Sequence, residues 1–382
     1  MFNLQNYRLQ GMKQSYIRSM TTECNKVKGI NLGQGLCKLP TPDFIKEAAI
    51  EAINTGVNFY SSAEGIIELR EAISKKLERD NNIVANPNNI IITNGSTGAF
   101  TSTINSLLRP KDGILLFEPF YGYHRNISIL AGLEPQYLEL KFPEFTIDEK
   151  MLVDSIRPNT KAIVLCTPAN PSGKMWSKKE IDIIASVSEH YNLLVITDEI
   201  YEYITYDGRK HYSPASNEKL NQRTVTIMGF SKTFSVTGWR LGYAVASKKL
   251  ANEIKLANDL YYVCSPTPFQ KGIIAGLQAP ISYYENMRTS FEIKRNKLYN
   301  ALKNIGFNPI LPQGAYYMMA DISKLKCKNS LEAAMTFLQK TQVAAVPGSA
   351  FYEHKSGEKF LRFCFAVESE ILDKACCQIL SF

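Results

Sequence analysis

The sequence predicts an α/β protein: a mostly parallel sheet with helices on both faces, followed by a smaller α+β region. Short runs of β-branched and aliphatic residues alternate with amphipathic windows as far as residue 246. These runs are continuously apolar, which is typical of parallel strands buried on both faces. After Ser265-Pro266-Thr267-Pro268 the pattern becomes helical, and the last part of the chain mixes short strands with helices.

The individual elements follow from period and length. We expect strands at residues 89–93, 113–117, 162–166, 193–197, 225–228 and 241–246, and later at 316–320 and 360–365. Helices are expected at 97–108, 123–131, 178–190 and over a long stretch at 269–302. Ser177 and Glu180 have the spacing of a capping box at the start of the third helix.

Composition excludes several classes of protein. With 382 residues, 45% hydrophobic and 21% charged, the chain resembles an ordinary globular protein, and its longest apolar runs are too short to span a membrane. The net charge of +8 comes from scattered basic residues, so no nucleic-acid partner is expected. The eight cysteines form no Cys-x-x-Cys pair and the four histidines do not pair with them at zinc-ligand spacing. The sequence therefore predicts a cytoplasmic protein with reduced thiols and no metal site.

Two turns with unusual residues follow predicted strands, where open α/β sheets bind their ligands. Asn94-Gly95-Ser96-Thr97-Gly98 leads into a helix, so its N–H groups and hydroxyls could hold an anion, although an ordinary glycine-rich turn explains it equally well. Thr167-Pro168-Ala169-Asn170-Pro171-Ser172-Gly173 contains two prolines that would hold Asn170 in a fixed position.

Two charged residues also stand at strand ends. Asp198 ends an apolar strand, where a carboxylate requires a cationic or hydrogen-bonding partner, either a structural arginine or a ligand. Lys232 follows the next strand between Phe230 and Phe234. A lysine in such a setting can lose its proton on burial and form a Schiff base with a carbonyl compound.

The residues around Lys232 resemble a known family. Ser231-Lys232-Thr233-Phe234, with Gly238-Trp239-Arg240-Leu241-Gly242, is similar to the cofactor-lysine signature of class I/II pyridoxal-phosphate aminotransferases, the aspartate aminotransferase superfamily of fold type I. Asn170, Asp198-Glu199-Ile200-Tyr201 and Arg362 fall in the family's order. The early segments resemble the branch that contains kynurenine/glutamine and methionine aminotransferases: Arg8-Leu9-Gln10-Gly11, Ile30-Asn31-Leu32-Gly33-Gln34-Gly35 and Pro40-Thr41-Pro42.

The resemblance covers essentially the whole chain and implies a fold. It implies a large cofactor domain at residues 46–280 with a mostly parallel seven-stranded sheet flanked by helices. Residues 281–382 would form a small α+β domain, which residues 1–45, an N-terminal arm, would join.

The resemblance also implies a cofactor site for pyridoxal 5'-phosphate. Lys232 would hold the cofactor as a Schiff base and move a proton during the reaction, and Asp198 would pair with the pyridinium nitrogen. Asn170 and Tyr201 would hydrogen-bond the ring 3-oxygen. Tyr121 would stack on the ring, with Phe120 as the alternative if the register shifts. The phosphate would be held by Gly95, Ser96, Thr97, Ser231 and Arg240.

Other residues concern the substrates and a second subunit. Arg362 would bind the substrate α-carboxylate as a bidentate fork, assisted by the Gly35 backbone and by Asn170. Tyr60 matches the family's tyrosine that reaches the phosphate of the neighbouring subunit, so the resemblance implies a homodimer. The substrates would be an L-amino acid and a 2-oxo acid.

The sequence departs from the family pattern in two places. Gly229 stands where a serine is frequent, so one phosphate contact is absent or comes from Ser231. Thr97 or Gly98 stands where bacterial aspartate enzymes carry a lysine. The aromatic, uncharged stretch 260–264 aligns with the side-chain pocket of related enzymes. Together these features favour aromatic or other neutral amino acids, including methionine or glutamine.

Two alternative functions share much of this description. A carbon–sulfur β-lyase would use the same lysine, aspartate and arginine, and only the last step would differ. A non-catalytic effector module of a transcription regulator would need an N-terminal DNA-binding domain. About forty residues precede Pro42, too few for one, and Lys232 is intact. Amino-group transfer is the function that we expect.

Overall fold

The computed structural model describes residues 7–9, 16–35, 37 and 39–382. Gln10 and Gly11 of the predicted opening motif lie outside this part of the chain. No helix among the described residues is long and apolar enough to cross a membrane.

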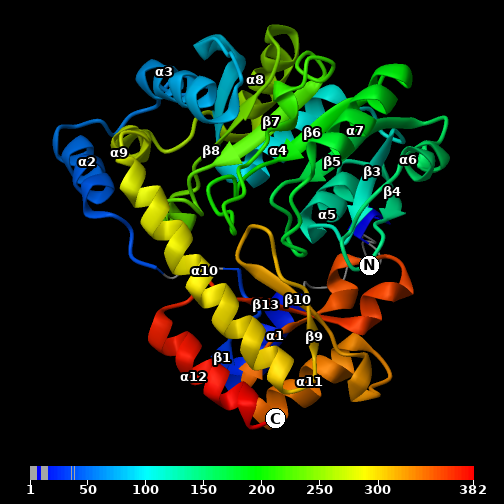
Figure 1. The fold of residues 1–382 in the computed structure, drawn as a ribbon. Coiled ribbons are helices and arrows are strands. Elements are labelled where there is room, and N and C mark those ends of the chain that lie inside the picture. Colours follow the sequence, from blue (N-terminus) through cyan, green and yellow to red (C-terminus); the bar gives the residue numbers. More distant parts are fainter. Residues whose placement is uncertain (1–6, 10–15, 36, 38) are drawn as a thin grey trace, which may run out of the picture.

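A seven-stranded sheet forms the centre of the larger part of the molecule, in the upper half of Figure 1. Its strand order is β2-β8-β7-β6-β5-β3-β4, and only β8 runs antiparallel to its neighbours. The strands are β2 (Ile90–Thr93), β3 (Gly113–Glu118), β4 (Glu134–Glu139), β5 (Thr160–Cys166), β6 (Leu194–Asp198), β7 (Thr224–Gly229) and β8 (Gly242–Val245). The predicted α/β class with a mostly parallel sheet is confirmed.

The helices cover this sheet because their apolar faces pack on its two surfaces. They are α2 (Asp43–Asn54), α3 (Ile67–Lys76), α4 (Gly95–Leu107), α5 (Gly122–Leu130), α6 (Glu149–Ser155), α7 (Lys178–His190), α8 (Lys248–Tyr262) and α9 (Thr267–Leu277). The capping box at α7 forms as expected. Ser177 Oγ accepts from the Glu180 N–H, and the Glu180 carboxylate accepts from the Ser177 N–H at 2.9 Å. Apolar residues of both sheet faces are buried.

The smaller part contains a four-stranded antiparallel sheet in the order β12-β13-β10-β9 and a two-stranded parallel pair, β1 with β11. The strands are β1 (Ile30–Asn31), β9 (Asn308–Pro309), β10 (Tyr317–Asp321), β11 (Val343–Ala344), β12 (Val346–Pro347) and β13 (Phe360–Cys364). Helices α1 (Tyr16–Lys26), α11 (Ser330–Thr341) and α12 (Ser369–Leu380) complete it. The pairing of β1 with β11 places the beginning of the chain beside its last part.

Helix α10 (Ile281–Asn304) runs from beside the large sheet down to the small one (Figure 1). The sequence predicted one continuous helical stretch at 269–302, but residues 278–280 separate α9 from α10. Gln278 is the C-cap of α9 and Pro280 is the N-cap of α10, and a proline disfavours helical backbone at the residue before it. Strand β4 was not expected, and it is an edge strand with Glu134 and Glu139 exposed.

Candidate functional site

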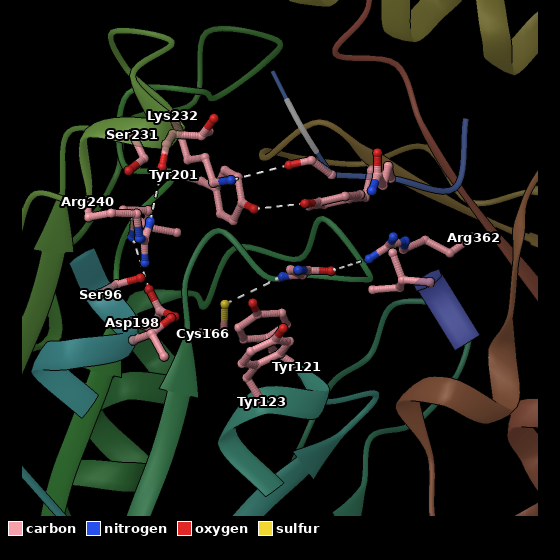
Figure 2. A pocket seen from close by; sticks show the side chains of 18 of the residues that line it. Ser96, Tyr121, Tyr123, Cys166, Asp198, Tyr201, Ser231, Lys232, Arg240 and Arg362 are labelled. Carbon is pink, nitrogen blue, oxygen red and sulfur yellow. Dashed lines mark hydrogen bonds between the residues drawn. The ribbon is translucent and has the colours of Figure 1, made fainter. Parts of the chain in front are cut away.

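A cavity of about 500 Å³ lies where the carboxyl ends of the parallel strands face the smaller part (Figure 2). It collects residues from both ends of the chain and from the strand ends between them. The predicted site residues that line it are Gly35, Ser96, Thr97, Tyr121, Asn170, Asp198, Tyr201, Ser231, Lys232, Arg240 and Arg362. In Figure 2, Arg240 and Ser96 lie on one side of the cavity and Arg362 lies on the other.

One side of the cavity is built to receive an anion. Helix α4 begins at Gly95, so the N–H groups of its first turn have no partner within the helix. Gly95 has a φ of +72°, and a Cβ there would lie 2.7 Å from Arg240 Nη2. The guanidinium therefore lies directly against the turn. The buried Oδ1 of Asn94 has no partner among the described residues.

Asp198 ends β6 as a buried carboxylate beside a buried histidine. His124 Nε2 lies 3.1 Å from Asp198 Oδ2, and the N–H of Ile200 donates to Asp198 Oδ1 at 3.3 Å. The neighbouring Glu199 is turned away from the cavity and contacts His211 Nε2 at 2.6 Å. Asp198 thus keeps an oriented negative charge at the cavity wall.

Lys232 follows β7 and its Nζ donates to the backbone oxygen of Gly35 at 3.2 Å. Burial lowers the pKa of Lys232, because the charged ammonium loses solvation. Beside it, the hydroxyl groups of Tyr201 and Tyr317 lie 3.0 Å apart. Burial raises the pKa of Tyr201 well above its ordinary value, so its hydroxyl keeps its proton. A partly buried amine and a buried phenol therefore border the same cavity.

Arg362 lies on β13 with only 1% of its surface exposed. Its guanidinium lies 4.4 Å from the ring centre of Tyr317 and 4.8 Å from that of Phe351. Nη1 donates to Asn170 Oδ1 at 3.0 Å and Nη2 donates to the Gly33 oxygen at 2.6 Å, while the buried Nε has no partner among the described residues. Each terminal nitrogen keeps a second N–H, so the group can still donate to a carboxylate.

Aromatic rings form another wall. Tyr121 and Tyr123 stack with ring centres 5.3 Å apart, and Tyr121 borders the cavity. Phe120, the alternative ring residue, lies against Tyr137 at 5.5 Å and does not border it. Cys166 Sγ accepts from the Asn170 N–H at 3.4 Å, which helps to hold Asn170 in place.

Two predicted site residues do not line the cavity. Gly95 lies just behind it in the turn already described, and Tyr60 is 79% exposed. The stretch 260–264, expected at the side-chain pocket, does not line it either. That end of α8 is exposed, with Leu260 at 84%.

Sequence reasoning missed other lining residues, including Ile17, Arg18, Gln34, Tyr123 and Tyr317. It also missed His124, the partner of Asp198. A usable signal existed for His124, which lies three residues after Tyr121 in the first turn of α5, so both face the same side of the helix.

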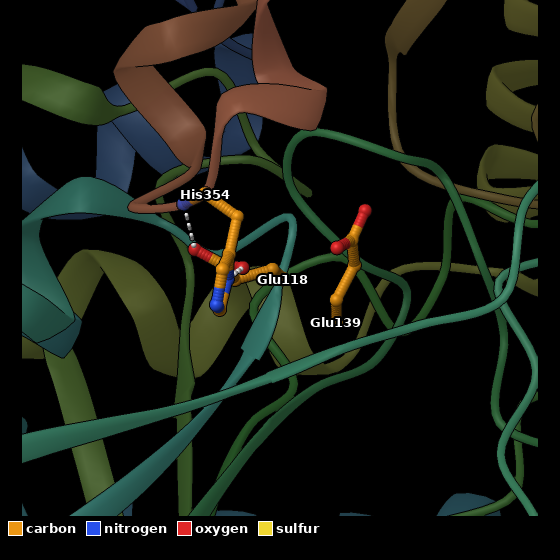
Figure 3. Close-up of side chains that lie close together, drawn as sticks. All are labelled: Glu118, Glu139 and His354. Carbon is orange, nitrogen blue, oxygen red and sulfur yellow. Dashed lines mark hydrogen bonds and ion pairs between the residues drawn. The ribbon is translucent and has the colours of Figure 1, made fainter.

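A second cluster joins the two parts of the molecule near this cavity (Figure 3). Ligand atoms of Glu118, Glu139 and His354 lie within 4.8 Å of one another, as a metal site would require. However, the buried Glu118 already accepts from the N–H groups of Glu353 and His354 and contacts His354 Nδ1. This cluster is therefore a link between the end of β3 and the segment after η7 (Gly348–Phe351).

Comparison with known proteins gives the class that the fold and the cavity define. Residues 27–379 match the family model described as aminotransferase class I and II. The chain is 35% identical to a probable aspartate aminotransferase of Methanocaldococcus jannaschii, over 96% of each chain. It is 34% identical to the aromatic-amino-acid aminotransferase 2 of Thermococcus litoralis, over 96% of this chain and 95% of the other.

A solved structure agrees with these sequences. The Escherichia coli protein YbdL, whose structure is described as identifying a methionine aminotransferase function, superposes with a TM-score of 0.95 at 27% identity. The alignment covers 99% of this chain and 100% of the YbdL chain.

The chain belongs to the class I and II aminotransferases. It is therefore an enzyme that uses pyridoxal phosphate to move amino groups between amino acids and 2-oxo acids. The cavity fits that cofactor: it combines an anion-holding turn with a partly buried amine, a buried carboxylate and a flat aromatic wall.

Proposed function

We propose that Lys232 is the amine that joins covalently to the aldehyde carbon of the cofactor, and that the enzyme transfers the amino group of an L-amino acid to a 2-oxo acid. The observation that carries this proposal is the partly buried side chain of Lys232 in the same cavity as the buried Asp198 carboxylate. When bound, pyridoxal phosphate withdraws electrons from the substrate's α-carbon.

Lys232 would also move a proton at the α-carbon of the substrate. Its lowered pKa makes the free amine more abundant at neutral pH, and only the free amine can accept that proton. The Gly35 oxygen, 3.2 Å away, orients the amine in the absence of substrate.

Other residues would hold the cofactor. Asp198, oriented by His124, would keep the ring nitrogen protonated, while Asn170 and the protonated Tyr201 hydroxyl would donate to the ring 3-oxygen. Tyr121 would stack on the ring. The phosphate would be bound by Gly95, Ser96, Thr97, Ser231 and Arg240. A Cβ at position 229 would lie 2.5 Å from Ile200 Cδ1, so a serine there would require the end of the Ile200 side chain to move.

Arg362 would bind the α-carboxylate of the substrate, with Gly35 and Asn170 beside it. The unpartnered Nε and the free N–H groups on its terminal nitrogens support this role. We propose aromatic or other neutral amino acids as favoured donors. The support is the apolar wall of Ile17 and Tyr123 together with the relatives that act on aromatic amino acids or methionine.

We further propose a homodimer in which Tyr60 reaches the phosphate of the partner subunit. Tyr60 is 79% exposed and Phe59 is 72% exposed, as expected for side chains that another subunit covers. Mixing Tyr60→Ala with Lys232→Ala subunits tests this, because one site of the hybrid dimer would have both residues intact. Activity that stays at the level of the separate variants would contradict it.

The division of the chain and its location are also proposals. Residues 1–45 with 281–382 would move as one domain and 46–280 as the other, which the β1–β11 pairing supports. A cytoplasmic location is supported by eight free cysteines, several of them buried.

The direct test follows the visible absorbance of the cofactor when single amino acids are added to the loaded protein. Donors that bleach the band identify the first half-reaction, and 2-oxo acids should restore it. Turnover that needs no amino acceptor, with pyruvate released from a cysteine conjugate, would instead identify a β-lyase.

A further inference from the structure

Tyr317 lines the cavity with only 2% of its surface exposed, and none of the roles proposed above involves it. It is the first residue of β10, which pairs with β13 so that Met319 lies opposite Arg362. Residues two apart in a strand share a face, so Tyr317 and Arg362 lie on the same side of this sheet. The Arg362 guanidinium lies 4.4 Å from the centre of the Tyr317 ring, which helps to hold the ring in place.

The hydroxyl group of Tyr317 is enclosed by other segments of the chain. Gly35 lies against it, because a Cβ at that position would come within 2.0 Å of the hydroxyl oxygen. The hydroxyl of Tyr201 lies 3.0 Å away. The backbone fixes this approach: the Ala315 N–H donates to the Ile204 oxygen at 2.9 Å, which ties the turn that carries Tyr201 to the start of β10. The contact between the two hydroxyls is therefore built into the fold.

The number of protons gives this contact a direction. Burial raises the pKa of Tyr201 well above its ordinary value and the pKa of Tyr317 to about 12, so each hydroxyl carries one proton at neutral pH. In the proposed function, Tyr201 donates its proton to the ring 3-oxygen of the cofactor. The Tyr201 oxygen can then only accept from Tyr317, and the hydroxyl of Tyr317 is the donor of the pair.

We propose that the Tyr317 hydroxyl donates to the Tyr201 oxygen and thereby directs the Tyr201 O–H toward the ring 3-oxygen. This inference deepens the proposed function and rests on it, because it requires Tyr201 to hold that oxygen. The direction of a hydroxyl proton is set by the donors and acceptors around it. A hydroxyl that accepts a hydrogen bond is also a stronger donor, because hydrogen bonds in a chain polarise one another. Tyr317 is thus a positioning residue that acts on the cofactor through Tyr201.

This role has a consequence for the visible band of the cofactor. In pyridoxal phosphate the 3-oxygen lies next to the carbon that Lys232 joins, so the proton on the joining nitrogen shares this oxygen with the Tyr201 donor. When that donor is weakened, the 3-oxygen holds the proton on the nitrogen more firmly. The pH at which the nitrogen loses its proton, and at which the band changes, should then rise.

Other titratable groups near the two hydroxyls do not produce this signal. Burial raises the pKa of the tyrosines and thiols nearby, so that they stay protonated near neutral pH; these are Tyr121, Tyr316, Cys166 and Cys364. The arginines of the cavity stay charged. Three further groups near Lys232 or in the cavity, Cys37, Tyr123 and Asp198, are the same in every variant compared.

The test is a spectrophotometric pH titration of the cofactor-loaded protein and its variants. Tyr317→Phe keeps the ring against Arg362 and removes only the hydroxyl. It should raise the midpoint of the transition by roughly 0.3 to 1 pH unit. Tyr201→Phe should raise the midpoint further, because the donor itself is lost. In the double variant the midpoint should stay within about 0.2 pH unit of that of Tyr201→Phe, because Tyr317 acts through Tyr201.

Tyr206→Phe is the matched control. It removes another buried hydroxyl, which donates to the Ala315 oxygen, and Tyr206 is not among the described residues that line the cavity. It should lower the stability of the protein without moving the midpoint. An unchanged midpoint in Tyr317→Phe, an equal shift in Tyr206→Phe or a further shift in the double variant would each overturn the proposal and leave the role of Lys232 intact. A visible band that Lys232→Ala does not alter would instead refute the proposed function.

Discussion

The two ends of the cavity are built in different ways. At the cofactor end, Ser96, Asp198 and Lys232 lie at or just after the ends of β2, β6 and β7, three strands of one sheet. At the substrate end, Arg18 comes from α1 and Arg362 from β13, far apart in the sequence. A single sheet fixes the position of the groups that do the chemistry. The substrate end depends on how separate segments pack, so specificity can change there while the chemistry is kept.

The largest effect on turnover is expected from a substitution at the cofactor end of the cavity. Lys232→Ala should lower turnover by at least about a thousandfold, because it removes both the covalent amine and the proton acceptor. The phosphate turn and Asp198 remain, so the variant should still bind the cofactor but with an altered visible band. Stopped-flow absorbance with methionine or an aromatic amino acid measures this. Activity close to that of the wild type would refute the role of Lys232.

The next largest effect is expected from a substitution at the substrate end of the cavity. Arg362→Lys should lower kcat/KM by on the order of a hundredfold for mono- and dicarboxylic amino acids alike, because both classes share the α-carboxylate. The visible band of the bound cofactor should not change. A loss confined to dicarboxylic substrates would show that Arg362 does not bind the α-carboxylate that both classes share.

A smaller effect on turnover and stability is expected from replacing His124, which contacts Asp198 at the cofactor end. His124→Phe keeps a ring against Phe100, whose centre lies 4.6 Å from that of His124, but removes the contact to Asp198 at 3.1 Å. We expect turnover to fall about tenfold and the cofactor-free protein to lose about 1–3 kcal/mol of stability, because a buried carboxylate loses a partner. His124→Gln, whose amide can still donate, should recover part of both. Equal losses in the two variants would indicate that only packing matters.

The difference between the two ends also explains what the sequence could predict. Ser96, Asn170, Asp198 and Lys232 follow continuous apolar strands, so a strand pattern alone indicates where they gather. Arg18 enters the cavity only because α1 packs beside β11 and β12, and no local pattern reports that packing.

Strand β4 of the large sheet was not predicted, and the reason is also physical. β4 has exposed glutamates at both ends and a proline beside the first, because it forms the edge of the sheet. It therefore lacks the continuous apolar run that marked its neighbours. The domain boundaries inferred from the resemblance stay predictions.

The smallest expected effect concerns the link between the two parts. Phe120 N–H donates to the Phe351 oxygen at 2.9 Å, and a few residues away the buried Glu118 contacts His354. The hydrogen bond between His354 and Glu118, together with the negative charge of Glu118, raises the pKa of His354. The acids Glu139 and Glu353 act in the same direction, and Arg125 pairs with Glu353 at 3.1 Å.

Because the pKa of His354 is higher in the folded protein than in the unfolded chain, the link stabilises the fold fully below the unfolded value of about 6.5. The contribution disappears as the pH rises through the folded pKa. A double-mutant cycle of Glu118→Gln and His354→Gln, followed by urea unfolding, should give a coupling below about 1 kcal/mol, since His354 is half exposed. That coupling should be larger at about pH 6 than at about pH 9, and added salt should reduce it. A coupling that does not change with pH would mean that the contact between Glu118 and His354 is a neutral hydrogen bond. The link between the end of β3 and the segment after η7 would then not respond to protonation.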